Sequence, residues 1–113
     1  MPSLRHNKIH CQNYTSEIEI TIEILSGKWI VLILVHLGEK KVVRFNEFRK
    51  VFPDITQKML SQQLKKLEEN RIIKKKIYNE IPPKVEYTLS KEGERLIPIL
   101  DAMQVWGLEY LKE

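Results

Sequence analysis

The feature that most constrains the fold is a helical leucine repeat in the middle of the chain. Residues 56–70 place three leucines at i, i+4 and i+7, and these would form one buried stripe: Leu60, Leu64 and Leu67. Thr56 is a favourable N-cap for such a helix, and Asn70 suits the left-handed conformation at its C-terminal end. The opposite side would be polar, with Gln57, Lys58, Ser61, Gln62, Lys65 and Glu69. The pattern predicts a helix that packs on a core by one face and presents the other to solvent.

A basic, β-rich segment follows this helix directly. Residues 72–78 contain three consecutive lysines flanked by Ile and Tyr, and residues 79–83 form a polar turn in which two prolines exclude a central strand. From Val85 to Leu89, apolar and polar residues alternate. Two strands joined by a polar turn predict a basic β-hairpin.

The segment 15–25 supports two interpretations. Isoleucines at 18, 20, 22 and 24 alternate with polar residues, which is a strand pattern. Ile18, Ile22 and Leu25 also share helical spacing, and Thr15 or Ser16 would cap a helix. Periodicity favours the strand by a small margin, and the helix stays open.

Three short elements are predicted between this segment and the leucine helix. Residues 28–37 are nearly all apolar, and Gly38 would cap them as a buried helix. Residues 42–44 would form a short strand. Asn46 would cap a second, short helix, which Pro53 ends.

The last predicted helix begins at the N-cap Ser90 and is apolar on more than one face. Residues 29–37 and 60–67 already fill the core of so small a domain. A further helix with two apolar faces therefore indicates a partner subunit.

The order of these elements predicts one fold. A length of 113 residues suits a single compact domain, here residues 15–113, and the polar residues 1–14 would form a flexible arm. A short helix, a turn and a helix with an exposed polar face form a helix-turn-helix, and the basic hairpin behind them forms a wing. The predicted fold is therefore α+β, mainly helical: a winged helix-turn-helix.

Positive charge gathers on the predicted helix and wing. The net charge is +4, but residues 56–79 carry seven Lys and Arg against two Glu, whereas residues 80–113 carry four against seven acidic residues. A basic block beside an ordered core is the electrostatic footprint expected for a polyanion partner. Double-stranded DNA is the predicted partner.

The candidate base-contacting residues lie in the first two turns of the leucine helix. Gln can bond adenine, Lys can reach guanine and Ser can serve several bases, so the candidates are Gln57, Lys58, Ser61 and Gln62. Candidates for contacts to the DNA backbone, including those of the wing, are Lys28, Arg44, Asn46, Lys65, Lys74, Lys75, Lys76, Tyr78, Asn79 and Lys84. RNA binding is an alternative, although the aromatic stacking surface common in RNA readers is missing. A protein-interaction module without DNA binding would instead need an apolar face here.

Several classes of protein are excluded. One cysteine cannot form an internal disulfide, and the longest apolar run, 29–35, is far shorter than the roughly 20 residues of a membrane span. The first residues lack the apolar core of a signal peptide, so a cytoplasmic protein is expected. No catalytic constellation, cofactor motif or zinc pattern is visible, and His6, His10 and Cys11 have no recognised metal spacing. We expect neither an enzyme nor a cofactor or metal.

Five sequence motifs match one family in order. They are GKW at 27–29, RFNEF at 44–48, ITQKMLSQQLKKLE at 55–68, YNEIPPKVEYTLS at 78–90, and the spaced residues Gly93, Leu96, Pro98, Leu100, Trp106 and Gly107. Over about residues 16–110, the chain resembles the HxlR-type winged helix-turn-helix transcriptional regulators, which are relatives of the MarR group.

The resemblance implies a homodimeric, bacterial-type regulator that binds DNA. It also implies that segment 15–25 is a helix. The first and last helices would build the dimer interface, through Ile18, Ile22, Leu96, Leu100, Met103, Trp106 and Tyr110. Two such subunits would place their recognition helices on an inverted-repeat operator. Related regulators imply a small-molecule or oxidant effector between the dimer helices and the DNA-binding lobe, but no polar cluster in the sequence marks a pocket there.

The chain departs from the family pattern at two places. Arg71 stands where the turn after the recognition helix usually has glycine, and Asn70 would supply the left-handed residue instead. Several family members sense oxidants through a cysteine that commonly aligns with Ser16, whereas Cys11 lies five residues earlier. A redox-sensing regulator that uses Cys11, close to Lys8 and His10, is therefore an alternative to an incidental thiol.

Overall fold

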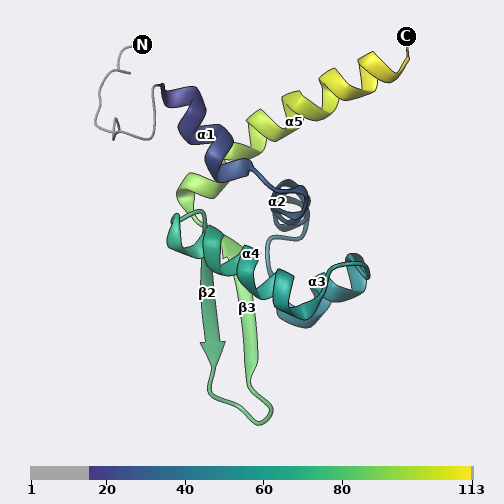
Figure 1. The fold of residues 1–113 in the computed structure, drawn as a ribbon. Helices are drawn as coiled ribbons and strands as arrows, with labels where there is room; N and C mark the ends of the chain where they lie inside the picture. The colour runs from purple at the N-terminus through teal and green to yellow at the C-terminus, as the bar shows by residue number, and fades with distance from the viewer. Residues whose placement is uncertain (1–15, 113) are drawn as a thin grey trace.

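The computed structural model describes residues 16–112 (Figure 1). Its helices and strands follow in the order α1 (Glu17–Leu25), α2 (Lys28–Lys40), β1 (Val43–Arg44), α3 (Phe45–Val51), α4 (Gln57–Glu69), β2 (Ile73–Tyr78), β3 (Lys84–Leu89) and α5 (Lys91–Leu111). This order confirms the predicted winged helix-turn-helix, with α3 and α4 as the helix-turn-helix and β2–β3 as the wing. None of the helices in this part of the chain is both long and apolar enough to cross a membrane.

Segment 17–25 is helical, as the family resemblance implies. The Ser16 side chain accepts a hydrogen bond from the Glu19 N–H at 3.4 Å, which caps the helix. None of the residues of α1 is buried. The alternating isoleucines therefore do not reflect a strand.

The core lies between α2, α4 and the sheet. The buried residues of α2 are Ile30, Ile33, Leu34 and Leu37, and they join one cluster with Phe48 of α3 and the α4 leucines Leu60, Leu64 and Leu67. All three α4 leucines are buried, which confirms the stripe expected from their spacing. Trp29 and Phe45 pack on the edge of this cluster.

The sheet has three antiparallel strands in the order β1-β3-β2. The wing pairs in register from Ile73 with Leu89 to Tyr78 with Lys84. Because side chains alternate along a strand, the face with buried Ile73 and Tyr87 lies on the core, and the opposite face points outward. The outward face carries Lys74, Lys76, Tyr78, Lys84, Glu86 and Thr88.

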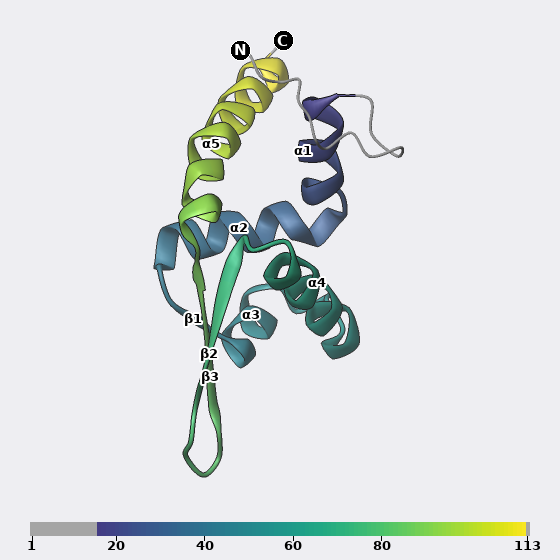
Figure 2. The same cartoon turned by 90° about the vertical axis from the view of Figure 1, so that its left-hand side faces the viewer.

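The molecule has two projecting ends. Figures 1 and 2 show that the wing extends from one end of the domain and that α1 and α5 extend from the other. Beyond Leu100, every residue of α5 except Gly107 is exposed. The radius of gyration is 15.9 Å, above the value of about 13 Å expected for a compact domain of this length.

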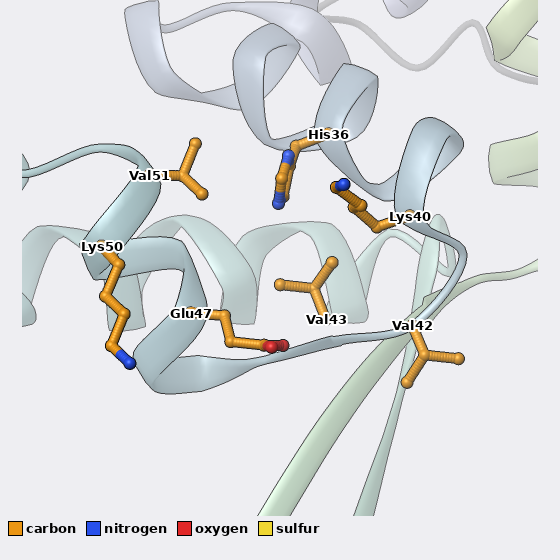
Figure 3. A pocket seen from close by; sticks show the side chains of 7 residues that line it. All are labelled: His36, Lys40, Val42, Val43, Glu47, Lys50 and Val51. Atoms are coloured by element: carbon orange, nitrogen blue, oxygen red, sulfur yellow. The ribbon is translucent and has the colours of Figure 1, made fainter.

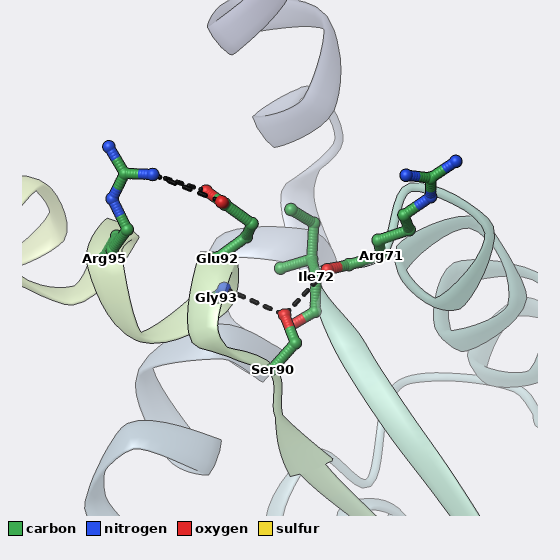
Figure 4. A network of polar contacts seen from close by, with 6 residues as sticks. All are labelled: Arg71, Ile72, Ser90, Glu92, Gly93 and Arg95. Atoms are coloured by element: carbon green, nitrogen blue, oxygen red, sulfur yellow. Dashed lines mark hydrogen bonds and ion pairs between the residues drawn. The ribbon is translucent and has the colours of Figure 1, made fainter.

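One serine joins the start of the wing to the start of α5. The Ser90 hydroxyl lies 2.6 Å from the Arg71 carbonyl oxygen and 2.9 Å from that of Ile72, and it accepts a hydrogen bond from the Gly93 N–H at 3.1 Å (Figure 4). The Ser90 N–H also donates to the Ile72 carbonyl at 2.9 Å. These bonds confirm Ser90 as the N-cap of α5 and fix the helix against the first residues of the wing.

Two predicted caps in the first half of the chain are wrong. Gly38 lies inside α2, where it packs close to Ile97 of α5, and α2 continues to Lys40. Lys41 makes the turn instead, with φ of 73° and a hydrogen bond from the Val42 N–H to the Lys40 carbonyl. Asn46 lies within the first turn of α3.

The N-cap position of α3 belongs to Arg44. Its backbone N–H donates to the Glu47 carboxylate at 2.7 Å, which is the reach-back half of a capping box. Glu47, three positions into the helix, therefore bonds the free N–H at the start of α3, the capping role that the sequence assigned to Asn46.

The prediction for Asn70 is also wrong. Asn70 has φ of −83°, and Arg71 itself takes the left-handed conformation with φ of 62°. The Ile72 N–H donates to the Leu67 carbonyl and the Arg71 N–H to the Glu68 carbonyl, which is the Schellman pattern. Arg71 thus occupies the site that favours glycine, and the burial of Ile72 and Leu67 in one cluster fixes it there.

The Ser90 junction predicts that Gly93 tolerates no side chain. A Cβ atom at Gly93 would overlap the Ile72 carbonyl oxygen, which is backbone and cannot rotate away. We expect Gly93→Ala to lower the free energy of unfolding by about 3 kcal/mol, measured by urea denaturation. Gly107→Ala on the same helix is the control, because nothing in its own subunit lies within 4 Å of a Cβ atom there. Equal stability of the two variants would contradict this description of the junction.

Candidate nucleic-acid interface

The exposed face of α4 carries the predicted base-contacting residues together. The Thr56 hydroxyl accepts a hydrogen bond from the Met59 N–H at 3.0 Å and caps the helix as predicted. Burial of the leucine stripe turns five polar side chains to solvent: Gln57, Lys58, Ser61, Gln62 and Lys65. The arrangement presents both donors and acceptors from Gln57 to Lys65 of the helix.

The other residues outside the wing that are predicted to contact the DNA backbone lie at the starts of two helices. Arg44 and Asn46 are exposed at the start of α3. Lys28 is exposed at the start of α2, where its ammonium group lies 4.9 Å from the centre of the Trp29 ring.

A lysine without a predicted role ties α4 to the turn between α1 and α2. The Lys66 ammonium group lies 3.3 Å from the Ser26 carbonyl oxygen and 3.4 Å from the Ser26 hydroxyl oxygen. Lys66 therefore helps to fix the orientation of α4. Sequence reasoning missed this contact because its partner is 40 residues away.

The three consecutive wing lysines divide between two faces. Lys74 and Lys76 share the outward face, whereas Lys75 points to the side of α4 and lies 4.0 Å from the Glu68 carboxylate. A surface pair of this length contributes little stability, but it places a carboxylate next to one predicted phosphate contact. Asn79 follows the end of β2 and is exposed.

Glu68 also acts on the core side of the wing. Burial raises the pKa of the Tyr87 hydroxyl, and the negative charge of Glu68 raises it further. Tyr87 packs edge-on against Phe48, with ring centroids 6.1 Å apart. A neutral Tyr87 thus belongs to the core at the place where α4 meets the sheet.

Tyr78 makes a polar network on the outward face of the wing. Its hydroxyl donates to the Glu86 carboxylate at 2.9 Å, and that carboxylate lies 3.8 Å from the Lys84 ammonium group. Lys76 and Lys84 place their ammonium groups 4.8 Å and 4.3 Å from the centre of the Tyr78 ring. Sequence reasoning named both lysines and Tyr78 but missed Glu86. The signal was present, because Lys84 and Glu86 are two positions apart on one strand.

Six of the seven predicted dimer residues lie on the projecting helices with part or most of their side chains accessible. Ile18 and Trp106 are each 66% exposed, and Trp106 stacks on Tyr110 with ring centroids 5.1 Å apart. Leu96 is half-buried against the core. Leu100 is 4% exposed and belongs to the core of its own chain, so its assignment to the dimer surface is wrong.

Shallow cavities lie away from the α4 face, among them one of about 570 Å³ between α2, β3 and α5. A cavity of about 310 Å³ lies between α2 and α3 and is lined by His36, Lys40, Val42, Val43, Glu47, Lys50 and Val51 (Figure 3). Another, of about 240 Å³, is lined by residues of α1 and α5 together with Ile72, and the ion pair of Glu92 with Arg95 lies at its edge. The sequence marked no pocket near α1 and α5.

Residues 16–112 contain no group of three His, Cys, Asp or Glu side chains that could hold a metal ion. Cys11, His6 and His10, and the proposed arm at 1–14, lie outside the described residues.

Known proteins share this sequence and this fold. Residues 24–113 match the family described as HxlR-like helix-turn-helix. The HTH-type transcriptional regulator YdeP of Bacillus subtilis (strain 168) is 46% identical over 93 residues, which cover 82% of this chain and 72% of YdeP. YtcD of the same organism is 44% identical over 100 residues, which cover 88% of this chain and 79% of YtcD.

Solved structures agree. The structure of the HTH-type regulator YtcD superposes with a TM-score of 0.82 at 43% identity and covers 88% of this chain and 100% of that one. The redox regulator HypR in its reduced form superposes with a TM-score of 0.78 at 41% identity and covers 81% of this chain and 90% of HypR. This chain belongs to the HxlR-like helix-turn-helix family and is a DNA-binding transcriptional regulator.

Proposed function

We propose that this regulator binds DNA sequence-specifically as a homodimer on an inverted-repeat operator. One observation carries the proposal: the buried leucine stripe of α4 leaves an exposed row of Gln, Lys and Ser beside a wing that bears outward lysines. A helix of this kind fits the major groove, and a basic hairpin fits the adjacent backbone. The relatives named as transcriptional regulators favour this function over a protein-interaction module and over an enzyme, and such a regulator would act in the cytoplasm.

The side chains divide by role. Gln57, Lys58, Ser61 and Gln62 would read base edges, because they lie in the first two turns of α4. Contacts to phosphates would come from Lys65 on α4, from Lys74, Lys76 and Lys84 on the wing, and from the helix-start residues Lys28, Arg44 and Asn46. Lys75 would contribute less than its neighbours because it points toward α4, away from the outward face that carries Lys74, Lys76 and Lys84.

The dimer would form through α1 and α5. Ile18, Ile22, Met103, Trp106 and Tyr110 are exposed apolar or aromatic residues on two helices that extend from the same end of the domain. A concentration of large exposed apolar side chains at one end of a domain is typical of a protein interface. A two-fold dimer would hold two α4 helices about 34 Å apart, one turn of DNA, for which an inverted repeat is the matching site. An effector would have a place in the cavity between α1 and α5.

Selection from a random DNA pool tests base reading. We expect enrichment of an inverted repeat.

Two substitutions separate base reading from phosphate binding. Gln62→Ala should cost about 1–3 kcal/mol of binding free energy and relax the base preference at one position in each half-site. Lys74→Ala should weaken binding to every sequence and reduce the slope of log K against log salt by about one unit, measured by fluorescence anisotropy. If Gln62→Ala also weakened all sequences equally, its role as a base reader would be refuted.

The dimer predicts that a charge on α5 separates the subunits. Trp106→Glu should give a folded monomer, since Trp106 is 66% exposed and its ring stacks only on Tyr110 among the described aromatic pairs. Sedimentation equilibrium measures the mass, and circular dichroism checks the fold. Gln104→Glu is the control for added charge on the same helix. A dimeric Trp106→Glu protein, or a monomeric wild type, would contradict this interface.

A second candidate function is redox control through Cys11. Two structures similar to this chain are those of the redox regulator HypR in its reduced and oxidized forms. Cys11 is the one cysteine of the chain, so a disulfide would join two subunits: two thiols give up two electrons and two protons to an oxidant such as diamide, and one S–S bond forms.

Diamide should therefore change the DNA affinity of the wild type and leave Cys11→Ser unaffected. Non-reducing electrophoresis should show the linked dimer of the wild type, which dithiothreitol reverses. An equal response of both proteins in the binding assay would rule out this mode of control.

A further inference from the structure

Both the hydroxyl group and the ring of Tyr78 already have partners within the wing. It is half-buried at the end of β2, and its hydroxyl hydrogen is already donated to Glu86 at 2.9 Å. Its ring has two ammonium groups within 5 Å of the centroid, from Lys76 at 4.8 Å and Lys84 at 4.3 Å. Direct contact of Tyr78 with DNA, as the sequence suggested, would have to displace this network.

The hairpin register brings these four residues together. Tyr78 pairs directly with Lys84 across the two strands, and Lys76 pairs with Glu86. Lys76 and Tyr78 are two positions apart, so both point to the outward face with their partners. The contacts follow from the register, not from a loop conformation.

A lysine on a flexible stem loses conformational entropy when it grips a phosphate. A cation over an aromatic ring is held by the ring quadrupole before any ligand arrives. Glu86 holds Lys84 from a second side at 3.8 Å. Part of the ordering that phosphate binding requires is thus already present in the unbound wing.

We propose that Tyr78 is a positioning residue whose ring holds Lys76 and Lys84 as a pair of phosphate-binding ammonium groups on the outward face of the wing. This inference rests on the proposed function, because it concerns how the wing grips the DNA backbone. The role belongs to the aromatic ring; the hydroxyl serves only to anchor the ring to Glu86.

The test measures the salt dependence of binding to a short labelled duplex of arbitrary sequence, because phosphate contacts do not depend on sequence. For each lysine that no longer reaches a phosphate, Tyr78→Leu should weaken binding about tenfold at low salt and lower the slope of log K against log salt by about 0.9. Tyr78→Phe keeps the ring and should retain the wild-type slope. Circular dichroism and thermal unfolding check that each variant folds.

A double-mutant cycle shows whether Tyr78 acts through the lysines. In the Lys76→Ala, Lys84→Ala background, adding Tyr78→Leu should change the slope no further. A wild-type slope for Tyr78→Leu, or an equal loss for Tyr78→Phe, would overturn the proposal. If Tyr78→Leu fails to fold, a wild-type slope for the double lysine variant overturns it instead.

Failure of the proposed function gives a different result. A wild type that binds no duplex in a salt-dependent way contradicts both the function and the role of Tyr78. A wild type that binds the arbitrary duplex but enriches no operator contradicts sequence-specific reading alone, and the slopes still decide the role of Tyr78.

Discussion

Burial of one face of α4 is the constraint on which the candidate site depends. Leu60, Leu64 and Leu67 are fully or almost fully buried against α2 and its neighbours. Removal of that apolar area from water stabilises the helix and also fixes its rotation about its own axis. The polar row from Gln57 to Lys65 then faces outward as a geometric consequence. The same packing places Glu68 beside the wing near Lys75, and its charge adds to the rise that burial produces in the pKa of Tyr87.

Features set by local periodicity were predictable from the sequence. The leucine spacing predicted α4 and its exposed side, Thr56 and Ser90 were recognisable N-caps, and the alternation from Val85 to Leu89 predicted the second strand of the wing. Each of these depends on residues within a few positions of one another, so the chain itself carries the information. For segment 17–25, alternation favoured the wrong element by a small margin, helical spacing and a Ser16 cap kept the helix open, and the family resemblance decided between them.

Features set by tertiary contact were not predictable in the same way. Glycine is a common residue at helix C-termini, but Gly38 lies inside α2, where Ile97 packs against it. Arg71 adopts positive φ because the turn closes from Ile72 to Leu67, one residue later than Asn70 suggests. Leu100 shares the stripe of the other α5 residues, yet it is buried in the core of its own chain.

The same distinction between local periodicity and tertiary contact applies to the candidate site. The α4 positions predicted to read bases are exposed because the leucine spacing fixes the polar face of the helix. The carboxylates of Glu68 and Glu86 enter the site through helix packing and strand register, which pair residues far apart in the chain or on opposite strands.

The polar face of α4 should enter the major groove, and this is the central claim. Dimethyl sulfate protection on the selected operator measures this directly, because guanine N7 lies in the major groove and adenine N3 in the minor groove. We expect protection of guanine N7 in two patches whose centres are about 10 base pairs apart, one patch for each subunit. Protection that is absent from guanine N7, or confined to adenine N3, would contradict the placement of α4 in the major groove.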